Sequence, residues 1–161
     1  MFCEELFLSD EYKTIEYANF LADSLVKTAS EHSRALIVYL DGDLGAGKTT
    51  FVRGVLRSLG YTGAVKSPTY TLLEEYNFSG RLCIYHFDLY RFTSPQEWEE
   101  AGFDEVLTSP AICFIEWPHQ AEGYVSRPDL TIALSVHDNG RMCRITAQSD
   151  VGKKIIALWK K

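Results

Sequence analysis

The chain has 161 residues, a length at which one domain buries about 70% of the surface that its unfolded form exposes. Hydrophobic residues make up 46% and charged residues 24%, close to globular averages, which excludes a disordered, fibrous or collagen-like chain. The net charge is −6, whereas a protein that binds nucleic acid by itself usually has a basic surface. We therefore expect a single domain over residues 1–161 that meets RNA or DNA through a partner.

No segment has the character of a membrane anchor or a leader. The longest apolar run, residues 35–40, is far shorter than the roughly 20 residues of a membrane helix. The first five residues, MFCEE, are acidic where a signal peptide is basic. The four cysteines form no CxxC pair, which favours free thiols over a zinc site. These features predict a cytoplasmic protein with no membrane contact.

The predicted elements alternate between strands and helices. Residues 2–8 are typical of a strand, and Asp10 is placed to cap a helix that runs through about Thr28. Residues 35–40 predict a strand buried on both faces, and a helix over about residues 48–59 follows a glycine-rich turn.

Further elements complete a mixed sheet. We expect strands at residues 69–76, 82–87, 111–117, 130–136 and 141–148, a turn at 77–80, a short acidic helix at 95–102 and a closing helix at 151–159. The sequence HDNG at residues 137–140 predicts a hairpin between the last two strands. The fold class is therefore α/β, a mixed sheet flanked by helices, with antiparallel strand additions and a C-terminal hairpin.

Residues 42–49, GDLGAGKT, match the phosphate-binding pattern GxxxxGK[ST] without a mismatch, between a buried strand and an amphipathic helix. The glycines let backbone N–H groups wrap phosphates, and the helix points its positive end at them. Lys48 adds a cation for the β- and γ-phosphates, Thr49 offers a hydroxyl to Mg²⁺, and Thr50 is placed for the α-phosphate. The expected nucleotide contacts are Asp43, Leu44, Gly45, Ala46, Gly47, Lys48, Thr49 and Thr50. The match predicts a P-loop NTPase-like fold; the alternative is a glycine-rich structural turn.

An acid at the end of a second buried strand faces the Mg²⁺ shell in P-loop enzymes. Glu116 follows five apolar residues, and a carboxylate there is costly to bury unless it is paired or linked to a metal. We therefore expect Glu116 on the Mg²⁺ side, with a solvated strand end as the alternative. Trp117 beside it is placed to pack on the nucleotide or on a moving loop; ordinary core or surface packing is the alternative.

Two further segments lie where strands meet loops. Asp88, in HFDLYR at residues 86–91, is a candidate for ordering the attacking water or the metal shell; capping the next turn or pairing with Arg91 is the alternative. His86 is more typical of a structural histidine than of a catalyst. Thr69, in KSPTYT at residues 66–71, is placed to sense the γ-phosphate unless the segment is a plain strand-entry loop.

Four segments in a fixed order resemble the TsaE (YjeE) family: residues 42–50 (GDLGAGKTT), 66–72 (KSPTYTL), 86–91 (HFDLYR) and 115–118 (IEWP). The likeness extends over about residues 8–158. It implies the small ATPase of the bacterial machinery that makes threonylcarbamoyladenosine on tRNA beside the anticodon. Such a protein works with TsaD and TsaB, hydrolyses ATP weakly without them, and resets their complex rather than transferring the group itself.

The resemblance also implies roles for single residues. Lys48 carries over as the phosphate lysine, Thr49 and Glu116 as Mg²⁺ ligands, and Asp88 as a residue needed for hydrolysis. Trp117 carries over as functionally important. Position in the chain suggests two more nucleotide contacts, Glu11 at the start of the first helix and Arg141 at the hairpin exit. Glu11 as a helix N-terminal acid and Arg141 as a solvated hairpin residue are the alternatives.

Two other classes of protein share the size and the loop. A small-molecule or nucleoside kinase usually closes an arginine-rich lid over the phosphates. After Glu116 this chain offers only Arg127, Arg141 and Arg144, scattered over the predicted hairpin and its approach, which argues against a lid. A nucleotide-sensing module without hydrolysis is the third class.

Overall fold

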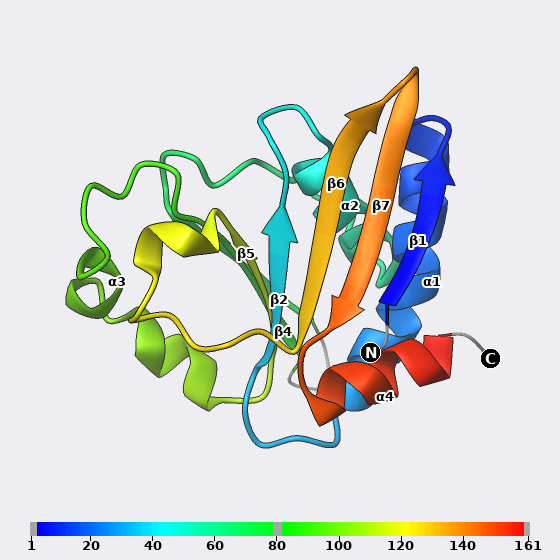
Figure 1. The fold of residues 1–161 in the computed structure, drawn as a ribbon. Helices are drawn as coiled ribbons and strands as arrows, with labels where there is room; N and C mark the ends of the chain where they lie inside the picture. Colours follow the sequence, from blue (N-terminus) through cyan, green and yellow to red (C-terminus); the bar gives the residue numbers. More distant parts are fainter. Residues whose placement is uncertain (1–2, 79–81, 160–161) are drawn as a thin grey trace.

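One seven-stranded sheet runs through the computed structural model, which describes residues 3–78 and 82–159. The strands are β1 (Cys3–Leu8), β2 (Leu36–Asp41), β3 (Leu73–Asn77), β4 (Cys83–Asp88), β5 (Ile112–Glu116), β6 (Leu130–His137) and β7 (Gly140–Ala147). They lie in the order β1-β7-β6-β2-β5-β4-β3 (Figure 1). β4, β5, β2 and β6 are parallel, whereas β3, β7 and β1 add antiparallel pairs at the two sides. The predicted mixed α/β sheet is confirmed.

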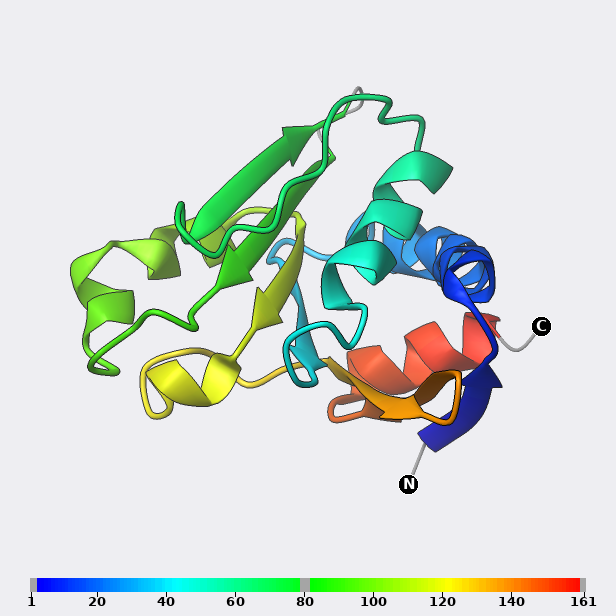
Figure 2. The ribbon, with the colours of Figure 1, turned by 90° about the horizontal axis from the view of Figure 1, so that it is seen from above.

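Helices cover both faces of this sheet (Figures 1 and 2). The α-helices are α1 (Glu11–Ala29), α2 (Lys48–Ser58), α3 (Glu97–Glu100) and α4 (Asp150–Trp159), and short 3₁₀ helices span Phe103–Thr108 and Pro118–Ala121. α1, α2 and α4 share one core with the sheet, and α3 and the 3₁₀ helices share the other. Among the described residues, no helix combines the length and the apolar character needed to cross a membrane.

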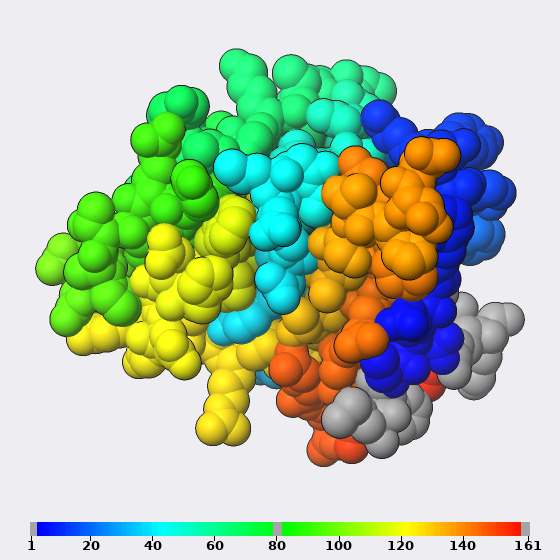
Figure 3. Space-filling model, turned by 45° about the horizontal axis from the view of Figure 1, so that its top comes forward, coloured from blue at the N-terminus to red at the C-terminus, as the bar shows by residue number. Residues whose placement is uncertain are grey.

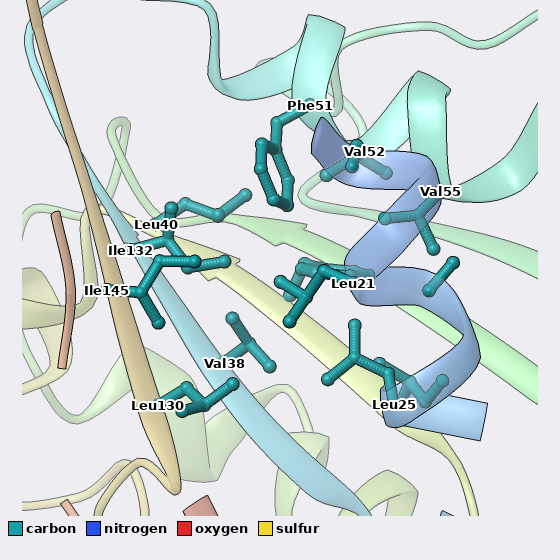
Figure 4. Close-up of a cluster of buried hydrophobic side chains, with 14 of the residues drawn as sticks. Leu21, Leu25, Val38, Leu40, Phe51, Val52, Val55, Leu130, Ile132 and Ile145 are labelled. Atoms are coloured by element: carbon teal, nitrogen blue, oxygen red, sulfur yellow. The ribbon is translucent and has the colours of Figure 1, made fainter. Parts of the chain in front are cut away.

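The larger core lies between the sheet and the α1–α2 pair. Leu21 and Leu25 of α1 and Phe51 of α2 meet Val38 and Leu40 of β2, all fully buried (Figure 4). The smaller core, on the opposite face, surrounds Trp98, Phe87, Cys113 and Ile115. Because β2 and β5 are covered on both faces, their sequences are continuous apolar runs rather than alternating ones.

The parallel centre brings three strand ends to one edge of the sheet. In the register, Leu40 of β2 lies beside Glu116 of β5, and Glu116 lies beside Asp88 of β4. The chain leaves β2 there and enters the glycine-rich loop that leads to α2. In open α/β sheets, ligands bind at this carboxyl edge, where connections leave in opposite directions.

Most predicted elements are present, with shifted ends. Asp10 caps α1 by accepting a hydrogen bond from Lys13 N at 2.8 Å, and the HDNG hairpin joins β6 to β7. The strand predicted for residues 69–76 begins only at Leu73, because residues 68–72 form a turn closed by Leu72 N donating to Pro68 O at 2.8 Å. Phe2 and part of the turn predicted at residues 77–80 lie outside the described residues. The two 3₁₀ helices were not predicted, because they lack a helical repeat long enough to detect.

Candidate functional site

The glycine-rich loop wraps around the end of β2 and opens the first turn of α2. Gly45 and Gly47 have φ angles of 81° and 107°, a backbone region that favours glycine. A Cβ on Gly42 would lie 2.5 Å from the carbonyl oxygen of Leu134, so the chain passes too close to β6 for a side chain. Since the N-cap residue of α2 is Gly47, no side chain occupies the first N–H groups of the helix, which remain available to an anion.

Lys48 lies at the centre of the site and is 4% exposed. Its Nζ donates to the carbonyl oxygen of Gly42 at 2.6 Å and lies 3.6 Å from Oε1 of Glu116. The ammonium group also stands over the ring of Trp117, 4.1 Å from the centroid. A buried ammonium needs such partners. The predicted phosphate lysine is therefore held between the loop and the end of β5.

Glu116 ends β5 and is buried, with 3% of its surface exposed. Its second oxygen, Oε2, lies 2.5 Å from Nε2 of His86 on β4. The alternative of a solvated strand end is wrong, because this carboxylate is paired on both oxygens and enclosed by the sheet and the loop. His86 itself is fully buried.

Asp88, which ends β4, is also buried and accepts hydrogen bonds from Thr69 Oγ1 at 3.1 Å and Tyr90 N at 2.9 Å. Ser67 Oγ lies 2.8 Å from Thr69 Oγ1 and extends this chain of polar groups. Burial raises the pKa of Asp88 above its ordinary value, and the nearby Glu116 charge adds to the rise, against the two hydrogen bonds. Asp88 does cap the following turn, but Arg91 does not pair with it and instead stacks on the ring of Tyr70 at 4.0 Å.

A cavity of about 220 Å³ joins these groups. It is lined by Leu44, Gly45, Gly47, Lys48, Thr49, Thr50, Ser67, Thr69, Asp88 and Glu116. The lining residues come from the loop, the start of α2, the 66–72 segment and the ends of β4 and β5. The fold thus gathers most of the predicted phosphate, metal and hydrolysis residues around one space.

The oxygen donors around this cavity fit Mg²⁺. The hydroxyl of Thr49 and the carboxylate of Glu116 are hard donors, and Mg²⁺ is usually held by one or two such groups, with phosphate oxygens and water completing its shell. The described residues contain no group of three or more His, Cys, Asp or Glu side chains placed to hold a metal by themselves. The site therefore suits a magnesium ion that arrives with a phosphate ligand.

A second cavity, of about 460 Å³, lies on the other side of the loop. It is lined by Asp10, Glu11, Thr14, Gly45, Gly47, Thr50, Asn139, Gly140 and Arg141. Arg141 donates to the carbonyl oxygens of Ala46 at 3.0 Å and Gly45 at 3.1 Å, so it lies against the loop rather than in solvent. Glu11 lies 3.9 Å from Arg53 of α2 and reaches the same cavity. Both residues are thus placed beside the loop, from ends of the chain far apart in sequence.

Four other predicted residues lie in the loop or beside Lys48. Asp43 and Leu44 form the exposed tip of the loop, and Ala46 is buried beneath it. In Figure 3 this loop, coloured cyan, lies at the surface between the orange β6–β7 hairpin and the green segments. Trp117 has a φ of 57° and packs its ring between Lys48 and Tyr90, whose ring centroid is 5.0 Å away. Trp117 is therefore a wall of the lysine site.

Sequence reasoning missed two contacts in this region. It favoured a structural role for His86, with no indication that its partner is Glu116. It also gave no sign that Arg141 holds the loop through backbone carbonyls. A histidine two residues before Asp88 on the same strand faces the same side of the sheet, which is the one available signal for the first contact.

Sequence comparison finds relatives over most of the chain. The sequence model of the family described as "Threonylcarbamoyl adenosine biosynthesis protein TsaE" matches residues 8–144. A Haemophilus influenzae protein named tRNA threonylcarbamoyladenosine biosynthesis protein TsaE is 42% identical over 151 residues, 94% of each chain. A Bacillus subtilis protein of the same name is 41% identical over 112 residues, 69% of each chain.

The fold has a relative among solved structures. The crystal structure of Bacillus subtilis YdiB superposes with a TM-score of 0.77 at 28% sequence identity, over 99% of this chain and 95% of that one. The family model covers most of this chain and the Haemophilus influenzae relative is 42% identical over 94% of it, so the chain belongs to the TsaE family of threonylcarbamoyladenosine biosynthesis proteins.

Proposed function

We propose that this TsaE-family chain is a Mg²⁺-dependent ATPase that acts with TsaD and TsaB in the threonylcarbamoyladenosine modification of tRNA, in the cytoplasm. The residues that line the phosphate cavity support the ATPase activity. Lys48, Thr49, Asp88 and Glu116 come from three segments of the chain and line one cavity beside a glycine-rich loop. This is the set of groups that phosphoryl transfer to water requires.

In this mechanism the chain mainly positions and neutralises charge. The N–H groups of residues 43–50 and the start of α2 hold the phosphates, and the Lys48 ammonium lies against the β- and γ-phosphates. Thr49 and Glu116 would hold the magnesium ion, which when bound would neutralise charge on the phosphate oxygens. Asp88 orders the attacking water, and its hydrogen bond with Thr69 links that role to the 66–72 segment.

The cavity on the far side of the loop suits the rest of the nucleotide. It shares Gly45, Gly47 and Thr50 with the phosphate cavity, so one ligand can lie across the loop with its ends in both. Glu11 and Arg141 line this second space and are the proposed contacts there. ATP rather than GTP follows from the family resemblance.

A partner supplies the RNA chemistry in this proposal. The net charge of −6 is unfavourable for holding tRNA alone, because phosphate contacts dominate the affinity of proteins for nucleic acids. We therefore place the tRNA on the TsaD–TsaB complex, with ATP hydrolysis by this chain resetting that complex.

The kinase alternative finds no support in the placement of the arginines. Arg141 is bound to loop carbonyls, and Arg144 pairs with Glu5 on the sheet face. Arg127 lines a separate cavity next to Tyr39. None of the three lies over the phosphate cavity as a lid arginine would.

Phosphate release measured with and without TsaD–TsaB, and with and without tRNA, tests the proposal. We expect slow release by the chain alone and faster release with the two partners. Glu116→Ala should lower turnover per folded molecule far more than the control Glu122→Ala, which removes an exposed glutamate outside the phosphate cavity, even where the loss of a partner for Lys48 and His86 lowers its melting temperature. Rapid phosphate transfer to a small acceptor by the chain alone would refute the proposal.

A further inference from the structure

Two polar residues of β4, His86 and Asp88, lie close to Glu116. Of these two, His86 does not reach the phosphate cavity. It is fully buried and does not line the phosphate cavity, whereas Asp88, two residues further along the same face of β4, does. A polar ring buried in the sheet costs free energy unless it is hydrogen-bonded. The hydrogen bond that compensates for burial of this ring is the one to Glu116.

The two oxygens of Glu116 have different partners. Oε2 lies 2.5 Å from Nε2 of His86, and Oε1 lies 3.6 Å from Nζ of Lys48. The imidazole approaches from within the sheet and the ammonium from the loop. These two contacts fix the plane of the carboxylate, which by itself turns freely about its last torsion.

The imidazole is the donor in this contact. Its other nitrogen, Nδ1, is buried without a hydrogen-bond partner among the described residues. A carboxylate oxygen can only accept, and an unpaired lone pair in such a place costs less than an unpaired N–H, so an imidazole with its N–H at Nε2 fits this contact and donates to Oε2.

We propose that His86 is a positioning residue that holds the carboxylate of Glu116 in the orientation needed to bind magnesium. Its hydrogen bond to Oε2 keeps Oε1 on the side of Lys48 and the phosphate cavity. The inference rests on the proposed role of Glu116 as a Mg²⁺ ligand. His86 itself touches neither nucleotide nor metal, and without its hydrogen bond the carboxylate would turn towards Lys48 with both oxygens.

Two polar replacements of similar size test this orientation. In His86→Gln the amide nitrogen falls near the position of Nε2 and can still donate to Oε2, whereas in His86→Asn the amide is one carbon too short. We measure ADP affinity by calorimetry in EDTA and over a range of Mg²⁺ concentrations, and the melting temperature of each variant. His86→Gln should bind ADP in EDTA like the unaltered protein, because Glu116 and Lys48 keep their contacts. The affinity of His86→Asn in EDTA is the reference from which its own Mg²⁺ effect is measured.

The expected difference lies in the Mg²⁺ requirement. Removing a hydrogen-bond partner of a metal ligand typically lowers metal affinity about 10- to 100-fold. We therefore expect that in His86→Asn the Mg²⁺ concentration at which ADP affinity changes is at least about tenfold higher than in the unaltered protein. In His86→Gln that concentration should stay close to the value of the unaltered protein. Ile84→Ala, a buried residue earlier on the same face of β4, controls for lost packing and should leave the requirement unchanged.

Three results would overturn the inference. His86→Asn with an unaltered Mg²⁺ requirement, while Glu116→Gln has a raised one, would show that Glu116 binds the ion without help from His86. An equal rise in the requirement in His86→Gln, His86→Asn and Ile84→Ala would show a general packing effect. An unaltered requirement in Glu116→Gln would refute the metal role of Glu116, and the positioning role would fall with it.

Discussion

Asp129 is a buried carboxylate that ties three parts of the chain together, and its replacement by Asn tests that role. Its Oδ1 accepts from Arg34 NH2 at 2.9 Å and from Ser149 Oγ at 2.7 Å, and its Oδ2 accepts from Arg34 NH1 at 3.1 Å and from Ile37 N at 3.0 Å. The residue is 2% exposed. It therefore joins the start of β2, the start of β6 and the turn before α4.

The expected loss follows from these four hydrogen bonds. In Asp129→Asn the amide oxygen can keep Ile37 N and Arg34 Nη1, while the NH₂ group faces Ser149, whose hydroxyl can turn to accept, and Arg34 Nη2, which loses its acceptor. The cost is that one bond and the charge assistance of the others, about 1 kcal/mol for each buried bond and less for the half-exposed Arg34. The sum is about 2 kcal/mol, which corresponds to a fall in melting temperature of about 4–8 °C for a chain of this size.

The contribution of Asp129 to the free energy of unfolding should change with pH in a definite direction. Burial raises the pKa of Asp129, but the hydrogen bonds from Arg34, Ile37 and Ser149 outweigh it, so the pKa lies below its ordinary value. A depressed pKa stabilises the folded state above the unfolded-state pKa of about 3.9 and loses that contribution as the pH falls through the folded-state value. The stability difference between the unaltered protein and Asp129→Asn should therefore shrink as the pH falls below about 4.

Urea unfolding at several pH values, followed by circular dichroism, measures this difference. The control is Glu5→Gln, which removes the same charge from an exposed pair with Arg144 and should cost less than about 1 kcal/mol. A difference for Asp129→Asn that stays constant with pH would mean that the cost comes from packing. No difference at pH 7 would refute the reasoning altogether.

The remaining predictions concern the nucleotide site. Lys48→Ala should lower ATP affinity at least about tenfold by calorimetry, because the phosphates lose a charged donor; affinity like that of Lys153→Ala, a change on α4, would contradict the P-loop role. Arg141→Met removes the donors to Gly45 and Ala46 and should lower affinity about tenfold, whereas Arg144→Met on the same strand should not; equal affinities would show that Arg141 does not order the loop. Gly42→Ala should cost about 1–3 kcal/mol in thermal unfolding, since its Cβ would meet the Leu134 carbonyl; unchanged stability would mean that the loop moves freely away from β6.

Local patterns in the sequence predicted the parts of the fold that depend on neighbouring residues. The apolar run before Gly42, the glycine spacing and the helix after Lys48 all follow from period and turn chemistry within a few residues. The turn at residues 68–72 shows the limit of this reasoning. Its residues, TYTL, have high strand propensity, yet Leu72 adopts a φ of 70° and bonds both Pro68 and Asp88.

The fold class, the phosphate loop and the strand ends that carry Asp88 and Glu116 could be predicted from short stretches of sequence, because each depends on neighbouring residues. Which side chains contact one another became known from the folded chain. His86 and Glu116 are 30 residues apart, and Arg141 and Ala46 are 95 apart. Such contacts depend on strand order and register, which no local period encodes. The parallel pairing of β4 with β5 thus turns a histidine that is typical of a core into the partner of the proposed metal ligand.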